Sequence, residues 1–183
     1  SRPGDVVLDP FSGRGTAPLQ AAAEGRIGVG NDLNPFAHLL TAAKVEPPTE
    51  AEVRTRLISL RLGYATLRAG SGAPDGRAAA ATAEEVAALP TEIALAFAPG
   101  TLAQLLYLRR MLHLDDPADR FIAAATVGIL HGKSGSYLSP VMPNTFSMAP
   151  RYVREFIART GFVAPERDAF ELIERKVRRL FRQ

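Results

Sequence analysis

The feature that most constrains the fold is an alternation of strand-like and helix-like segments close to the first residue. Residues 6–8, Val-Val-Leu, are typical of a short buried strand, and Gly13 and Gly15 allow a tight turn after it. An alanine-rich stretch over 17–24 predicts a helix, and residues 26–31 predict a second strand. A strand, a helix and a second strand form a βαβ unit, so the sequence predicts an α/β fold with parallel strands.

A carboxylate closes each predicted strand. Asp9 follows the first strand, and Asp32 follows the second. Parallel strands bring their carboxyl ends to one edge of a sheet, where the N–H groups of a glycine turn and the positive end of a helix dipole can hold a ligand. An acidic residue at the end of the second strand can accept hydrogen bonds from ribose hydroxyls. The pattern therefore predicts a site for a nucleoside-bearing cofactor.

Two other nucleotide-binding motifs fit this chain less well. A dinucleotide fingerprint needs a third glycine, and Pro18 occupies that position. The string Gly132-Lys133-Ser134 ends like a phosphate-binding loop, but Val127 stands where the first glycine is required. The stretch before it also predicts a helix, whereas a phosphate-binding loop follows a strand.

Beyond residue 46 the sequence predicts mainly helices. Thr49 and Glu52 form a capping-box pattern for a helix that runs to roughly Arg68. Helices are also expected from Thr101 and from Asp116 to about His131. Because two strands cannot complete a sheet, either further strands come from sequence outside this chain or this piece packs differently from its parent protein. We divide the chain into a cofactor-binding βαβ segment, a helix with an Ala/Gly/Pro-rich linker, and a helical region, over residues 1–46, 47–100 and 101–183.

The composition argues against several functional classes. The chain has 183 residues and no apolar run long enough for a membrane span. Because it has no cysteine, a disulfide framework and a cysteine nucleophile are excluded. His38, His113 and His131 lack the spacing of metal ligands, and we expect no metal. The sequence is compatible with a cytoplasmic protein. The chain starts at Ser1 without a signal-peptide pattern, and we expect it to be a piece of a longer protein.

The turn between the two predicted strands carries a more specific string, Asp9-Pro10-Phe11-Ser12-Gly13-Arg14-Gly15-Thr16. This string resembles the cofactor motif of the N4-cytosine and N6-adenine DNA methyltransferases, which commonly reads Asp-Pro-Phe-x-Gly-x-Gly-Thr. The segment Gly28–Pro35 also resembles the family's glycine-containing strand, which ends in an acidic residue followed by proline. The resemblance implies a Rossmann-like class I methyltransferase fold, S-adenosylmethionine as cofactor and DNA as partner, as in restriction–modification enzymes.

The resemblance also implies roles for individual residues. Backbone groups of the glycine turn would hold the methionine end of the cofactor, and Asp9 would orient its amino group. Asp32 would bind the ribose hydroxyls, and Leu33 would lie near adenine. Simpler structural roles stay open, because Asp9 could cap the turn, Leu33 could belong to the core, and Thr16 could cap the following helix. The implied cofactor-binding residues are Asp9, Pro10, Phe11, Ser12, Gly13, Gly15, Thr16, Asp32 and Leu33.

The family's catalytic motif, (Asp, Asn or Ser)-Pro-Pro-(Tyr, Phe or Trp), has no match here, and no catalytic residue is assigned. Asn34-Pro35-Phe36 and Ser139-Pro140-Val141 each lack the second proline. In one arrangement of the family the cofactor motif precedes a target-recognition insertion, and the catalytic motif comes last. The stretch Thr49–Gln183 would then be that insertion or part of it. Alone, the chain should bind cofactor weakly at best and should not transfer methyl groups.

Positive charge gathers towards the last residue. From Arg151 to Gln183 there are nine Lys or Arg and five Asp or Glu, a balance of +4, so the other 150 residues sum to −1. A phosphate-rich partner and a solvated helix face both explain this charge. The segment Leu130–Met148 also resembles a segment of bacterial family members, although a proline-rich connector explains it equally well. The candidate nucleic-acid contacts are Lys133, Arg151, Arg154, Arg175, Lys176, Arg178 and Arg179.

Two other functions stay open. Some RNA methyltransferases use a similar glycine motif, so RNA is an alternative substrate. A non-catalytic nucleotide-binding or DNA-binding module is the third possibility. The target base, the recognition sequence and the oligomeric state do not follow from the sequence.

Overall fold

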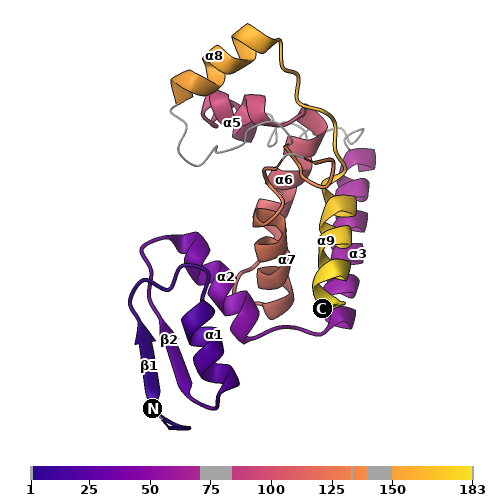
Figure 1. Ribbon diagram of the computed structural model, residues 1–183. Coiled ribbons are helices and arrows are strands. Elements are labelled where there is room, and N and C mark those ends of the chain that lie inside the picture. Colours follow the sequence, from indigo (N-terminus) through magenta and orange to yellow (C-terminus); the bar gives the residue numbers. More distant parts are fainter. Residues whose placement is uncertain (1, 71–83, 133, 140–149, 183) are drawn as a thin grey trace. The chain divides into compact units, whose positions relative to one another are not determined.

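The computed structural model describes residues 2–70, 84–132, 134–139 and 150–182 (Figure 1). The chain divides into two compact units. Unit 1 comprises Ser1–Arg56 and Leu112–Ala125, and unit 2 comprises Leu57–Met111 and Thr126–Gln183.

Unit 1 begins with the βαβ arrangement that the sequence predicts. Strand β1 (Val6–Asp9) leads through a turn into helix α1 (Thr16–Ala23), and the chain returns as strand β2 (Ile27–Gly30). The two strands pair in parallel, with Val6 opposite Ile27 and Asp9 opposite Gly30. The prediction of an α/β unit with parallel strands is confirmed at this level.

Helix α1 covers one face of the strand pair at very short range. A Cβ atom on Gly28 would lie 2.2 Å from the carbonyl oxygen of Pro18, so only glycine fits opposite the helix. Pro18 and Ala21 are buried on the strand side of α1. The glycines of β2 therefore have a packing reason, because a side chain there would push the helix away from the sheet.

The opposite face of the strand pair is aliphatic and open. Val6, Leu8, Ile27 and Val29 alternate with the residues that face α1, and they are 41–65% exposed. Their register pairs Val6 with Ile27 and Leu8 with Val29, so the four side chains form one continuous patch. We call these four residues the open sheet face.

The remaining elements of unit 1 are helical. Helix α2 (Pro35–Val45) is capped by Asn34, whose side chain accepts a hydrogen bond from the N–H of Phe36. Helix α3 (Glu50–Ala69) starts at the predicted capping box, because the N–H of Thr49 donates to Glu52 and the N–H of Glu52 donates back to Thr49. Only its first turns belong to unit 1.

A buried ion pair holds the first turns of α3 to helix α7 (Pro117–Val127) within unit 1. Asp119, 2% exposed, accepts two hydrogen bonds from the Arg56 guanidinium, at 2.6 and 3.0 Å. The same carboxylate accepts the N–H of His113 at 3.0 Å. Both oxygens of Asp119 are therefore used, which lets a charged side chain be buried.

Unit 2 is built from helices around its own core. Besides the rest of α3 it contains α5 (Thr91–Ala96), α6 (Pro99–Met111), α8 (Pro150–Thr160) and α9 (Ala169–Phe181). Tyr64, Tyr107 and Phe170 bring three of these helices together through ring contacts of 5.3–6.3 Å between centroids. The side chains of Leu60, Leu108, Leu138 and Ile173 are completely or almost completely buried.

Several local expectations need correction. Thr16 does not cap α1; it is the first helical residue, and Gly15, in a left-handed conformation, takes the cap position without a side-chain hydrogen bond. The helix predicted to reach about His131 ends at Val127. Most of the predicted linker, residues 71–83, lies outside the described residues. Across the described part of the chain, no helix has the length and apolarity that crossing a membrane requires.

Candidate functional site

The turn after β1 is fixed by its own backbone and by the end of β2. The Asp9 carboxylate accepts the N–H of Phe11 at 3.1 Å, and the N–H of Gly15 donates to the carbonyl of Ser12 at 2.7 Å. Ser12 in turn donates its N–H to the carbonyl of Asn31 at 2.9 Å. Gly13 and Gly15 have φ angles of 51° and 74°, which explains why glycine stands at both positions.

Asp32 links the two strand ends. Its Oδ2 atom accepts the N–H of Gly13 at 2.8 Å, and its Oδ1 atom accepts the N–H of Asn34 at 2.9 Å. These hydrogen bonds, the one from Asn34 first and the one from Gly13 second, lower the pKa of the Asp32 carboxyl below its ordinary value of 3.8. Asp32 is therefore ionised at neutral pH. Each of its oxygens keeps acceptor capacity for a hydroxyl group.

Helix α2 supports the turn from its other side. A Cβ atom on Gly15 would lie 2.4 Å from the Oγ1 atom of Thr41, and the ammonium group of Lys44 donates to the carbonyl of Arg14. The Oγ1 atom of Thr41 is buried and has no hydrogen-bond partner among the residues that the structure describes. Asn34, Thr41 and Lys44 were not predicted as site residues, because no local pattern indicates that α2 returns to this turn.

The structure brings most of the predicted cofactor residues to one edge of the strand pair. Asp32 accepts the N–H of Gly13 directly. Asp9 is joined to the same strand end through its carbonyl, which accepts the N–H of Asn31, the residue before Asp32. Ser12 and Gly15 are buried, and Pro10 and Thr16 are exposed. The hydrogen bond from the N–H of Phe11 is the one that a turn-capping role for Asp9 requires. It is equally compatible with the implied role of Asp9 in orienting the amino group of the cofactor.

Two apolar side chains at this edge point into solvent. Phe11 is 86% exposed, and Leu33 is fully exposed. The alternative that Leu33 belongs to the core is therefore wrong for this chain. An exposed aromatic ring and an exposed leucine beside an ionised carboxylate offer both apolar and polar contacts to a ligand.

The predicted absence of a metal stays a prediction. No group of three or more His, Cys, Asp or Glu side chains within the described ranges has an arrangement that could hold a metal ion. The described groups at the turn are backbone N–H groups, the carboxylates of Asp9 and Asp32, and exposed apolar side chains.

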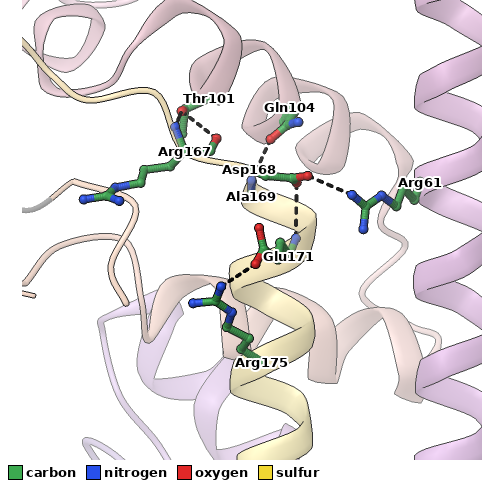
Figure 2. Close-up of polar contacts among 8 residues, drawn as sticks. All are labelled: Arg61, Thr101, Gln104, Arg167, Asp168, Ala169, Glu171 and Arg175. Atoms are coloured by element: carbon green, nitrogen blue, oxygen red, sulfur yellow. Dashed lines mark hydrogen bonds and ion pairs between the residues drawn. The ribbon is translucent and has the colours of Figure 1, made fainter. Parts of the chain in front are cut away.

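The start of the basic helix α9 is held to the other helices of unit 2 by hydrogen bonds (Figure 2). The hydroxyl of Thr101 donates to the carbonyl of Arg167 and accepts the N–H of the same residue, both at 2.8 Å. Gln104 accepts the N–H of Ala169 at 2.6 Å, and Arg61 donates to the Asp168 carboxylate at 2.8 Å. These contacts hold the start of α9 beside α6 and α3.

The candidate nucleic-acid residues of α9 are not equivalent. Arg175 and Arg178 pair with Glu171 and Glu174 one helical turn earlier. Desolvation, and then the charge of the neighbouring Arg179, lower the pKa of Lys176. Arg179 itself is exposed, and its side chain forms no ion pair within the described part of unit 2.

The other candidate contacts are spread apart or undescribed. Arg154 is exposed on α8, and in Figure 1 this helix and the last turn of α9 lie at opposite ends of unit 2. Lys133 and the side chain of Arg151 lie outside the described residues. The five described basic candidates therefore do not form a single patch.

Comparison of the chain with protein-family models, with curated proteins and with solved structures finds no match.

Proposed function

We propose that this chain is the S-adenosylmethionine-binding portion of an amino-group DNA methyltransferase. The observation that carries the proposal is the 2.8 Å hydrogen bond from the N–H of Gly13 to the Asp32 carboxylate. It joins the two parts of the motif resemblance, the glycine turn and the acidic end of the second strand. The ionised carboxylate then stands beside the turn, where ribose hydroxyls could donate to it.

The polar and apolar groups of the site suit an adenosyl cofactor. Phe11 and Leu33 supply exposed apolar surface for the adenine ring, and the turn supplies backbone groups for the amino-acid end. The start of α1 contributes the positive end of a helix dipole, which favours the cofactor's carboxylate. In this proposal Asp32 binds the ribose, and the turn orients the methionine portion.

The open sheet face supports a larger Rossmann-like sheet. Parallel sheets are normally covered on both faces, yet here the aliphatic face opposite α1 is open. In this proposal further strands and helices from outside the sequence complete the sheet, and the catalytic Pro-Pro motif comes from the same part. Methyl transfer is thus assigned to the completed protein.

Cofactor binding can be tested on this chain by titrating ¹⁵N-labelled protein with S-adenosylmethionine up to millimolar concentration. NMR detects weak binding, which is what an incomplete sheet should give. We expect the amide signals of Gly13, Gly15 and Asn34 to shift, and we expect Asp32→Ala to remove the shifts. Asp5→Ala is the matched control, since Asp5 lies just before β1, at the opposite end of the strand pair. Absence of shifts in the turn, or equal affinity in Asp32→Ala, would exclude the proposed site.

We also propose DNA as the partner of α9, supported by its exposed basic residues. Phosphate contacts should weaken with salt and should contribute equally on any DNA sequence. Arg179→Gln should therefore lower duplex affinity and reduce the salt dependence, whereas Arg109→Gln, on the exposed side of α6, should change neither. Fluorescence anisotropy with DNA and RNA duplexes measures this, and a preference for RNA would favour the RNA methyltransferase alternative.

A further inference from the structure

Helix α3 has a second apolar face besides the one it buries. Its inner side carries Leu57 and Leu60, which are 6% and 1% exposed. Ile58 and Leu62, in the same part of the helix, are 59% and 63% exposed. Isolated exposed leucines are common on proteins, so the spacing of these residues decides whether they form a surface.

The exposed residues follow a heptad pattern. Ile58, Leu62, Ala65 and Ala69 are separated by four, three and four positions, and all four are exposed. With about 100° of rotation per residue, they lie on one side of the helix, opposite the buried Leu60. This alternation of four and three is the seam spacing of helices that pair side by side. We call these four residues the heptad stripe.

Arginines run along one flank of the heptad stripe. Arg61 and Arg68 are exposed and lie seven positions apart, and Arg54 continues the same spacing in the sequence. Arg61 donates to Asp168, and Arg68 is hydrogen-bonded to Tyr64. Because a guanidinium carries five N–H donors, both arginines can bind a further carboxylate. The flank opposite carries Ser59 and Thr66 instead of charged residues.

We propose that the heptad stripe docks an amphipathic helix of a partner protein whose apolar seam is flanked by Asp or Glu. Ile58 and Leu62 supply apolar anchors, and the two alanines let the partner backbone approach closely. The arginine flank selects acidic residues, as charged flanking positions do in paired helices.

A second copy of this chain does not meet this charge requirement. In an antiparallel pair the arginine flanks would face each other and repel. In a parallel pair Arg61 and Arg68 would face the uncharged flank with Ser59 and Thr66. The proposal does not depend on cofactor binding or methyl transfer, because the heptad stripe contains none of the turn residues.

The test uses a labelled, side-chain-stapled helical peptide with a leucine seam and flanking glutamates, and a second peptide with lysines in their place. Fluorescence anisotropy should show binding of the glutamate peptide only. Ile58→Ser with Leu62→Ser should weaken binding at least about tenfold, whereas Leu67→Ser, exposed on the same helix outside the stripe, should not. Arg68→Glu should shift the preference towards the lysine peptide, and Arg109→Glu on α6 controls for general charge.

Other results would overturn the proposal. Equal binding of both peptides, or no binding of either, would exclude a partner helix with acidic flanks. A dimer seen in sedimentation and lost in Leu62→Ser would assign the stripe to self-association. If the serine variants melt at a lower temperature without any peptide binding, a segment of this chain covers the stripe. Circular dichroism of each variant checks that the helices are retained.

Discussion

The βαβ segment of unit 1 and the helices of unit 2 bury their aliphatic residues to very different extents. In the strand pair Val6 and Leu8 are more than 60% exposed, whereas Leu108 and Ile173 of unit 2 are 1% and 0% exposed. Yet the turn of the βαβ segment is held by a dense set of backbone hydrogen bonds. Local hydrogen bonding thus shapes the candidate site, while the aliphatic side chains of the strand pair stay largely exposed.

The largest expected effect compares one aliphatic residue from each region. Ile173→Ala should cost about 2–5 kcal/mol, because it leaves a cavity in a filled core. Leu8→Ala should cost less than about 1 kcal/mol, since its side chain is already largely in water. Denaturant unfolding of both variants measures the difference. Equal losses would mean that the open sheet face is covered in solution, and the comparison would fail.

A second prediction concerns the polar link within unit 1. Asp119→Ala should cost about 3 kcal/mol, because it leaves the Arg56 guanidinium and the N–H of His113 without their shared acceptor. Asp115→Ala is the matched control on the same segment, with an exposed side chain. Thermal unfolding of both variants gives the comparison. A loss similar to that of the control would show that the pair contributes nothing to stability.

A third prediction separates backbone strain from crowding in the turn. Gly13→Ala should cost roughly 1 kcal/mol, since its φ is positive but its surroundings are open. Gly15→Ala should cost about 1–3 kcal/mol, because the new methyl group would also overlap Thr41. Unfolding curves measure both losses, and Gly15→Ala combined with Thr41→Ser tests whether the Thr41 methyl contributes to the overlap. Equal costs for the two single variants would contradict the role of α2 as a support.

The smallest expected effect is on pH dependence. The pKa of Asp32 is lower in the folded chain than its ordinary value, so its bonds to Gly13 and Asn34 stabilise the ionised form. That stabilisation is complete above the unfolded pKa and is lost as the pH falls through the lower, folded value, which is below about 4. An NMR titration of the Asp32 carboxyl should show this depressed pKa. Asp32→Asn should flatten the acid limb of stability, and an unshifted pKa would contradict the proposed link between the strand ends.

Local patterns in the sequence were sufficient for much of the fold. The parallel strand pair, the helix between the strands and the Thr49–Glu52 capping box follow from hydrophobic spacing, glycine and capping residues, which act within a few positions. The start of α1 was predicted less well, because Gly15 rather than Thr16 takes the cap position. A left-handed glycine needs no side-chain hydrogen bond there, so the threonine was a misleading signal.

The sequence by itself determined which residues could form a cofactor turn, because that turn is built from consecutive residues and two strand ends. Only the tertiary structure decided that Thr41 and Lys44 of α2 support the turn and that Asp119 joins Arg56. The same holds for the two apolar faces of α3, of which one is buried and one is exposed. The physical reason is distance along the chain: contacts between residues tens of positions apart depend on how whole elements pack, and no local pattern specifies that packing.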